Sequence, residues 1–172
     1  MLKAPILSGE EKRLESLHEL MMLDTPSEPR FDKITADIAG KLNVPICTVS
    51  LVDNDREWFK SNFGYPGAEG NRSTSFCGHA MYAKNIFIIE DTLKDSRFAD
   101  NPSVIDEPHI RFYAGLALYN RKTKDPIGAF CVKDYKPRTL TLEEIDLLIT
   151  AAEKVEEELN SKTDVKIITH YS

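Results

Sequence analysis

Hydrophobic residues recur at helical spacing in three stretches of the chain. Each stretch follows a helix-start motif: Ser8-Gly-Glu-Glu11 and Thr141-Leu-Glu-Glu144 have capping-box spacing, and Thr25-Pro-Ser-Glu28 places a proline at the first helical position. Each predicted helix has one buried face, because the apolar positions are mostly three or four residues apart. These positions are Leu14, Leu17, Leu20 and Met21; Phe31, Ile34, Ile38 and Leu42; and Ile145, Leu148, Ile149, Ala152, Val155 and Leu159.

Shorter stretches rich in β-branched and aromatic residues predict strands. Residues 46–52 and 58–63 form one predicted hairpin, residues 112–119 and 127–133 form a second, and residues 86–89 form a separate short strand. Strands joined by short turns pair in an antiparallel manner. Three amphipathic helices on one face of such a sheet predict an α+β architecture.

The segment 72–81, Arg-Ser-Thr-Ser-Phe-Cys-Gly-His-Ala-Met, follows a glycine-rich loop and is expected to begin a short helix. Residues 91–98 predict a capped helical turn, and residues 101–108 an irregular stretch interrupted by two prolines. These parts are expected to cover the other face of the sheet, which would leave a concave space for a small ligand. Residues 1–160 then form a single domain, and residues 161–172 a tail or linker.

Composition and charge narrow the class of protein. A length of 172 residues fits one domain, and 41% hydrophobic with 29% charged residues is ordinary for a soluble fold. The net charge of −6 and the lack of a basic cluster argue against binding nucleic acid or an anionic membrane. No apolar run reaches the ~20 residues of a membrane span, and the N-terminus lacks a secretory signal, so we expect a cytoplasmic protein with reduced thiols.

Four motifs in this order resemble the GAF domain family, and most of all the subgroup fused to bacterial histidine kinases and diguanylate cyclases. The resemblance covers roughly residues 10–160. It implies a central antiparallel sheet of five or six strands, with terminal helices on one face and a ligand pocket beneath short helices and loops on the other. The motifs are Ser75-Phe-Cys-Gly-His-Ala80, Asp95-x-Arg97-Phe98 followed by Asn101-Pro102, His109-Ile-Arg-Phe-Tyr-Ala-Gly115, and Ile127-Gly-Ala-Phe-Cys-Val-Lys-Asp134.

The resemblance implies a sensory domain of intracellular signal transduction, such as a two-component system, that binds a small molecule and is not an enzyme. Members of this family bind cyclic nucleotides, haem, bilins, amino acids or other small molecules, so the ligand stays unknown. Pocket occupancy would be relayed through the N- and C-terminal helices of a homodimer. No kinase, cyclase or DNA-binding segment follows in this sequence, so we expect a separate signalling output protein.

The candidate ligand-binding residues lie in two of these motifs. Alternate residues of a strand share a face, so His109, Arg111 and Tyr113 are expected to lie in a row. Their imidazole, guanidinium and phenol are suited to binding a carboxylate or phosphate. The alternative for Arg111 is an internal ion pair with Asp91, Asp95 or Asp134. The candidates are Ser75, Phe76, Cys77 and His79 in the cover, and His109, Arg111 and Tyr113 on the strand.

The cysteines leave two other interpretations open. On a helix Cys77 and His79 would point about 200° apart and could not act as a nucleophile and base. This favours Cys77 as a small buried hydrophobe and His79 as a pocket-edge or capping imidazole. A thiol-dependent reductase, of the free methionine-(R)-sulfoxide reductase type found among GAF proteins, would need a resolving cysteine, and residues 91–108 contain none. Cys47 and Cys131 are expected in the core.

Two further alternatives complete the sequence-based hypotheses. The first is a dimerisation module with a vestigial pocket. The second is a metal site, which the sequence disfavours because no pair among the four candidate ligands has zinc-motif spacing. These candidate ligands are Cys77, His79, His109 and Cys131.

Overall fold

The structure, a computed structural model, describes residues 1–161. Its centre is a six-stranded sheet in the order β3-β2-β1-β6-β5-β4, and every neighbouring pair of strands is antiparallel. This confirms the predicted α+β fold. The strands are β1 (Ile46–Val52), β2 (Arg56–Phe63), β3 (Glu69–Asn71), β4 (Phe87–Ile89), β5 (Phe112–Tyr119) and β6 (Pro126–Asp134). Of these, only β3 was not expected, because its three residues include no apolar side chain.

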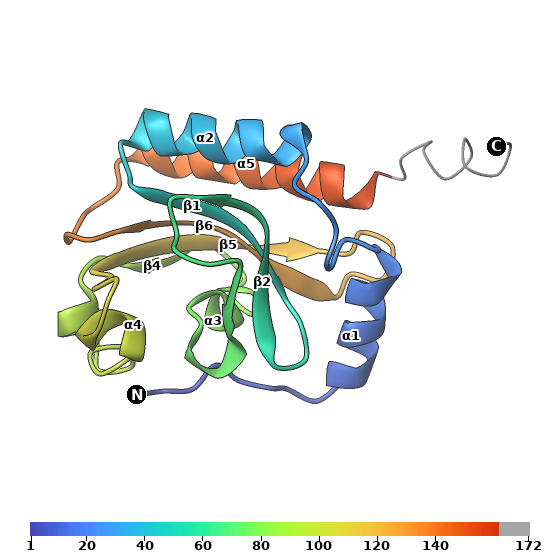
Figure 1. Cartoon of the computed structure of the whole chain (residues 1–172), viewed down its shortest axis with the longest axis horizontal. Helices are drawn as coiled ribbons and strands as arrows, with labels where there is room; N and C mark the ends of the chain where they lie inside the picture. The colour runs from blue at the N-terminus through green and yellow to red at the C-terminus, as the bar shows by residue number, and fades with distance from the viewer. Residues whose placement is uncertain (162–172) are drawn as a thin grey trace, which may run out of the picture.

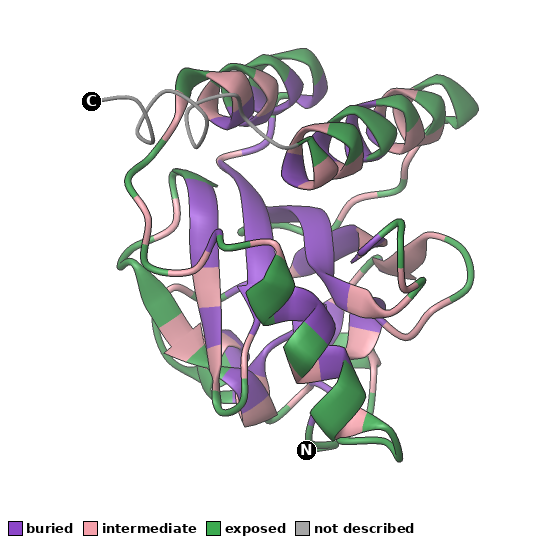
Figure 2. Ribbon diagram, turned by 90° about the vertical axis from the view of Figure 1, so that its right-hand side faces the viewer, coloured by how far each residue is buried: buried purple, intermediate pink, exposed green. Residues whose placement is uncertain are grey.

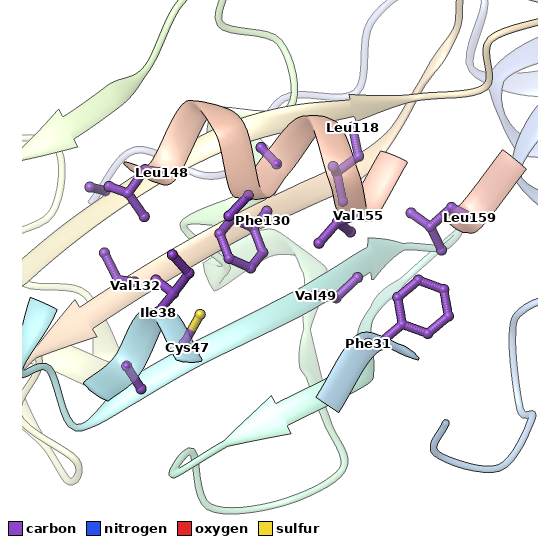
Figure 3. Close-up of a cluster of buried hydrophobic side chains, with 14 of the residues drawn as sticks. Phe31, Ile38, Cys47, Val49, Leu118, Phe130, Val132, Leu148, Val155 and Leu159 are labelled. Atoms are coloured by element: carbon purple, nitrogen blue, oxygen red, sulfur yellow. The ribbon is translucent and has the colours of Figure 1, made fainter. Parts of the chain in front are cut away.

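Helices α2 (Pro29–Leu42) and α5 (Leu142–Asn160) lie side by side across one face of the sheet (Figure 1). Their apolar stripes meet side chains of β1, β5 and β6 in one buried cluster, which Figure 3 shows between helices and strands. Phe31, Phe130 and Val155 are completely buried there. Burial of an apolar side chain of this size stabilises the fold by about 1.5–3 kcal/mol.

Helix α1 (Glu10–Glu19) lies at the end of the sheet, where β1 ends and β6 begins, and not beside the other two long helices (Figure 1). Its buried Arg13 guanidinium donates hydrogen bonds to the carbonyl oxygens of Val52, at 2.8 Å, and Pro126, at 3.4 Å. Of the three helices expected on one face, two therefore lie there. The third is anchored at the end of the sheet by Leu17 of its predicted stripe, which is buried in the same apolar cluster, and by the polar Arg13, which an apolar stripe does not reveal.

The start of α5 agrees with the sequence. The Thr141 hydroxyl accepts a hydrogen bond from the Glu144 amide at 3.1 Å, and the Glu144 carboxylate accepts one from the Thr141 amide at 3.0 Å. This is the predicted capping box, in which two otherwise unpaired amides of the first turn are satisfied.

The other two helix starts differ from the prediction. Helix α1 begins after Gly9, which has a left-handed backbone (φ 87°) and supplies no side-chain cap, so the box expected at Ser8 is not formed. Helix α2 begins at Pro29 and not at Pro26. Both prolines satisfy the same rule for a first helical position, and the sequence does not distinguish between them.

Short helices and loops cover the opposite face of the sheet (Figure 1). As predicted, the segment 72–81 is part of this cover. Helix α4 was not expected, because its prolines suggested an irregular stretch. Its proline occupies the first turn, and the Asn101 side chain caps it by accepting a hydrogen bond from the Ser103 amide at 3.0 Å. The elements of the cover are η1 (Arg72–Thr74), α3 (Cys77–Ala80), η2 (Thr92–Lys94) and α4 (Pro102–Ile105).

Both faces of the central strands are therefore shielded from solvent. All seven residues of β1 are buried, although they alternate between the two faces. Figure 2 shows the buried residues gathered on the central strands and the exposed ones on the outer sides of the helices. Within residues 1–161, no helix has the length and apolar character needed to cross a membrane. Apart from Ser161, the expected tail lies outside the described residues.

Candidate functional site

The face of the sheet beneath α3, here called the inner face, carries polar side chains. Thr48 and Ser50 reach it from β1, Tyr113 from β5, and Cys131 and Lys133 from β6, and all five are buried. A buried polar group costs free energy unless a partner replaces the water it has lost. The partners of these groups therefore indicate what the inner face can do.

Two lysines are equally buried in this molecule, at 2% exposure each, and they differ in their partners. The Lys60 ammonium donates hydrogen bonds to the Thr25 hydroxyl and the Pro26 carbonyl oxygen, each at 2.7 Å, and pairs with Glu28 at 2.7 Å. These three partners satisfy its three protons. The ammonium of Lys133, in contrast, makes no hydrogen bond or ion pair with any residue from 1 to 161.

Aromatic rings surround the Lys133 ammonium instead. It lies 4.5 Å from the ring centre of Tyr65, 5.7 Å from that of Phe76 and 6.0 Å from that of Tyr113. Contacts of this kind stabilise a cation through the negative ring faces. Burial acts to lower the pKa of Lys133, but the Glu57 carboxylate and nearby thiols outweigh it and hold the pKa above its ordinary value, so the ammonium stays charged.

Glu57 places a negative charge near the same face. This residue of β2 is 4% exposed, and its Oε2 atom has no hydrogen-bond partner among residues 1–161. It contributes more than any other group to raising the pKa of Lys133, yet the two side chains form no ion pair. A buried acceptor without a partner costs about 1–3 kcal/mol, and more when it is charged. The inner face thus holds two opposite charges that do not neutralise each other directly.

Two thiols meet between the cover and the sheet. The Cys77 sulfur lies 3.1 Å from the Tyr113 hydroxyl, and the Cys131 sulfur lies 3.1 Å from the Thr48 hydroxyl. Both thiols belong to one buried cluster, in which the Tyr113 hydroxyl lies over Gly115, the strand neighbour of Cys131. Burial raises the pKa of Cys77. Burial also acts to raise the pKa of Cys131, but the neighbouring Cys77 thiol, the charge of Lys133 and the Thr48 hydroxyl lower it to about 7. The surroundings therefore favour ionisation of Cys131 over ionisation of Cys77.

The position of α3 depends on Ser75 and Gly78. The Ser75 hydroxyl donates to the carbonyl oxygen of Arg72 at 2.8 Å and accepts from the Gly78 amide at 3.0 Å, and so it joins η1 to α3. A Cβ atom at Gly78 would lie 2.7 Å from both the Ala4 Cβ and the Ser75 hydroxyl oxygen. Glycine thus lets the N-terminal segment cross the cover closely, and the hydrogen bonds of Ser75 are structural.

Phe76 and Tyr113 fasten the cover to the sheet. Their rings stack at 5.3 Å between centres, and Phe98 packs against Phe76 at 5.0 Å. The Tyr113 ring lies over Gly115 of its own strand, where a Cβ atom would overlap the hydroxyl. Of the predicted site residues, the structure therefore brings together Phe76, Cys77 and Tyr113.

His79 contacts the N-terminal segment. Its Nε2 atom lies 3.2 Å from the carbonyl oxygen of Leu2, and its ring packs near Phe87 and Phe98, with 6.4 Å and 5.0 Å between ring centres. Burial lowers its pKa. As expected from the helical spacing, no hydrogen bond joins it to Cys77.

His109 and Arg111 do not line up with Tyr113. His109 is exposed and has a left-handed backbone (φ 59°), and β5 begins only after Arg111. The Arg111 guanidinium donates hydrogen bonds to the carbonyl oxygens of Val104, at 2.9 Å, and Ile110, at 3.3 Å. The predicted row was wrong because the strand does not extend back to residue 109. Arg111 also forms none of the three ion pairs suggested as its alternative.

The sequence comparison identifies the family, since a model of the GAF domain matches residues 27–159. This chain belongs to the GAF domain family. It is 34% identical over 138 residues to a cyclic di-GMP phosphodiesterase from Pseudomonas aeruginosa, and the match covers 80% of this chain and 23% of that protein. The chain thus spans less than a quarter of the length of that relative.

Solved structures of low sequence identity share the GAF fold. The GAF domain of an Acinetobacter phosphoenolpyruvate-protein phosphotransferase superposes with a TM-score of 0.59 at 18% identity, covering 86% of this chain and 92% of that one. A type II free methionine-R-sulfoxide reductase from Thermoplasma acidophilum gives 0.61 at 13% identity, covering 83% and 94%. The corresponding enzyme from Neisseria meningitidis, in complex with its substrate, gives 0.60 at 14% identity, covering 93% and 96%.

Lys133, Glu57 and Cys131 were not among the predicted site residues of this GAF domain. Lys133 could have been found, because a lysine within a strand of buried residues requires either a partner or a ligand, and the strand period places it on the same face as Cys131. The sequence does not mark Glu57 in the same way, because a charged residue in a hairpin strand often lies on a face of the sheet that is open to water.

The inner face is filled by its own side chains. None of the most pronounced hollows of residues 1–161 is lined by Cys77, Tyr113 or Lys133. Because Lys133 is almost completely buried, a small molecule that reaches it must displace part of the cover. Within the same residues, no three His, Cys, Asp or Glu side chains are grouped so that they could hold a metal ion.

Proposed function

We propose that this GAF domain is a sensory module of a signalling protein, and that it binds a small molecule between α3 and the inner face. The observation that carries the proposal concerns two opposite charges buried on the inner face. Within residues 1–161, the Oε2 atom of Glu57 has no hydrogen-bond partner, and the Lys133 ammonium makes no hydrogen bond or ion pair. Lys60, which is equally buried, has a partner for every proton. A fold can therefore satisfy a buried lysine, and the exception at Lys133 favours a binding role.

The charges define the chemical class of the ligand. Lys133 requires an anionic or carbonyl oxygen, and the Oε2 atom of Glu57 requires a hydrogen-bond donor. The rings of Tyr65, Phe76 and Tyr113 supply apolar contact area between these polar ends. A molecule that carries an acidic group, a donor and a small apolar or planar body fits this description.

The cover provides the means of response. Helix α3 has four residues and is held by the stacking of Phe76 and by the hydrogen bond that the Gly78 amide donates to the Ser75 hydroxyl. A ligand that displaces Phe76 would shift this segment and the N-terminal residues that cross it. In the proposal this shift reaches the terminal helices, as in other two-state switches in which small movements are passed through packed elements.

The proposed output lies outside the GAF domain itself. A relative with 34% identity is named as a cyclic di-GMP phosphodiesterase. We therefore propose that the domain regulates signalling activity carried by a larger protein or a separate partner, with cyclic di-GMP turnover as the first activity to examine. Binding at Ser75, His79, His109 and Arg111 stays a prediction.

Ligand binding is tested with the purified chain. Mass spectrometry identifies any molecule released on denaturation, and thermal shift is measured against amino acids, nucleotides and carboxylic acids. We expect a ligand that raises the melting temperature of the wild type and of Lys60→Met, but not that of Lys133→Met or Glu57→Gln. Lys60→Met is the matched control, because it removes a buried lysine outside the inner face. Equal shifts in all four proteins would refute the site, and no shift with any compound would refute the sensor.

Homodimerisation through the terminal helices is a separate proposal. A hollow between α2 and α5 is lined by Ile34 and Leu147, which are only partly buried. We propose that a second copy covers this surface and that the Leu147→Glu variant is monomeric. Light scattering measures the mass of both proteins, and a monomeric wild type at high concentration would refute the proposal.

A further inference from the structure

Cys77 and Cys131 lie on different elements and meet between them. Cys77 begins α3 in the cover, Cys131 lies in the middle of β6, and both belong to one buried cluster. The Cys77 sulfur contacts the Tyr113 hydroxyl at 3.1 Å, and this hydroxyl lies over Gly115, the strand neighbour of Cys131. The sequence predicted no resolving partner for Cys77, because residues 91–108 contain no cysteine. The fold supplies this partner from the sheet.

We propose that Cys77 and Cys131 form a redox-active dithiol, which a small hydroperoxide oxidises to a disulfide between the cover and the sheet. Both thiols are buried, so the oxidant must be about the size of a water molecule or enter when the cover opens. The proposal does not depend on ligand binding. It assigns a chemical role to two thiols that the proposed sensor does not require.

The reaction balances with a hydroperoxide as the only co-reactant. The Cys131 thiolate attacks the terminal peroxide oxygen, the O–O bond breaks, and the alcohol or water that leaves takes a proton. The resulting sulfenic acid is attacked by the Cys77 sulfur, which forms the S–S bond and releases water. In total, two thiols lose two electrons and two protons, and the peroxide is reduced.

The surroundings assign different roles to the two thiols. The Lys133 ammonium and the Thr48 hydroxyl favour the thiolate of Cys131, the attacking group. Cys77 faces the Tyr113 hydroxyl and stays a thiol until the second step. The Glu57 carboxylate opposes the ionisation of Cys131. Three further titratable groups interact electrostatically with Cys131, namely Cys47, Tyr65 and Tyr113.

The third cysteine is a matched internal control. Cys47 is also completely buried, but it faces the apolar cluster under α2 and α5, where burial raises its pKa. Its strand neighbour across the sheet is Val132, next to Cys131, so position and burial are closely similar. Only the neighbours on the two faces differ.

The test exposes the reduced chain to hydrogen peroxide, quenches with an alkylating agent under denaturing conditions, and maps peptides without reductant. We expect the wild type and Cys47→Ala to lose two thiols each and to yield one reducible peptide that joins residues 77 and 131. Cys77→Ser should form no disulfide and should carry a sulfenic acid on Cys131 that a dione reagent traps. Lys133→Met should react roughly tenfold more slowly at pH 7, because its Cys131 returns toward the ordinary thiol pKa.

The same experiment can overturn the proposal. Retention of all three wild-type thiols, a disulfide that includes Cys47, or stable wild-type sulfenic acid without a disulfide would each refute the dithiol. The wild type and Cys47→Ala decide the result by themselves, so the proposal does not depend on the folding of the other variants. Circular dichroism of each variant identifies any that is unfolded.

Discussion

The two faces of the central sheet are both buried, but they are built differently. The face under α2 and α5 is covered by two long helices, and its cluster consists of hydrophobic side chains (Figure 3). The inner face is covered by short helices and loops, and it buries a lysine, a glutamate, hydroxyls and two thiols. One face therefore supplies stability, and the other holds groups whose charge and reactivity their neighbours determine.

Cys47 and Cys131 show how strongly the face determines chemistry. Both are completely buried, on neighbouring strands. Burial raises the pKa of Cys47, whereas a cation, a neighbouring thiol and the Thr48 hydroxyl overcome burial at Cys131 and lower its pKa to about 7. Burial alone therefore does not make a thiol inert in this fold.

The largest expected change in the free energy of unfolding comes from a substitution on the apolar face. Phe130→Ala removes a completely buried ring from the centre of that cluster, and should lower the free energy of unfolding by about 3–5 kcal/mol. Urea denaturation followed by circular dichroism measures this loss. A loss below about 1 kcal/mol would mean that this face is not the main source of stability.

On the inner face, removal of buried side-chain charges is not expected to lower the free energy of unfolding. The double variant Glu57→Gln/Lys133→Met removes two buried charges that form no ion pair, and no hydrogen bond of Lys133 is lost. Replacement of buried charges by groups of similar volume is often neutral, or stabilising by about 1–4 kcal/mol. We expect the free energy of unfolding to stay level or rise, while ligand stabilisation is lost. A strongly destabilised double variant would show that these charges serve the fold.

The same contrast explains what the sequence could predict. The apolar face follows periodic rules, so the stripes of α2 and α5 and the hairpins of the sheet could be found from the spacing of residues such as Phe31, Ile38 and Val155. Element ends were less certain, as the start at Pro29 shows, because several residues satisfy the same capping rule.

The inner face has no such period. The row of His109, Arg111 and Tyr113 assumed a strand where His109 has a left-handed backbone, a conformation that nothing in its side chain requires. The meeting of Cys77 with Cys131 joins residues 54 positions apart in the sequence numbering, and only the strand order brings them together. Chemistry that depends on tertiary contacts is therefore the part that sequence patterns miss.

The contact of the Glu10 carboxylate with two arginines, at the edge of the inner cover, should make the stability of the protein depend on pH. The guanidinium groups of Arg13 and Arg72 hold the Glu10 carboxylate where α1 meets the start of the inner cover, with one contact to Arg72 at 3.1 Å. Burial acts to raise the pKa of Glu10, but these two hydrogen-bonded cations lower it from 4.5 to about 2. Because the folded-state pKa is depressed, this stability is complete above about pH 4.5 and is lost as the pH falls toward 2.

The corresponding variant is Glu10→Gln. It should lose about 1–2 kcal/mol of unfolding free energy at neutral pH, less than the full pKa shift would imply, because the carboxylate is partly solvated. Its stability should also change less between pH 5 and pH 2 than that of the wild type. Denaturation curves across this range measure both effects, and parallel pH profiles of the two proteins would contradict the assignment.

The smallest expected effect concerns the helix that covers the apolar face. Thr141→Ala removes the cap of α5 and should lower the free energy of unfolding by about 1 kcal/mol. Ser8→Ala is the matched control, because Ser8 stands before a helix in the same sequence pattern but is exposed and supplies no cap. If capping stabilises through the hydrogen bond and not through the motif, only the first variant changes the urea midpoint. Equal losses in both variants would show that the sequence pattern acts in some other way, for example through the unfolded chain.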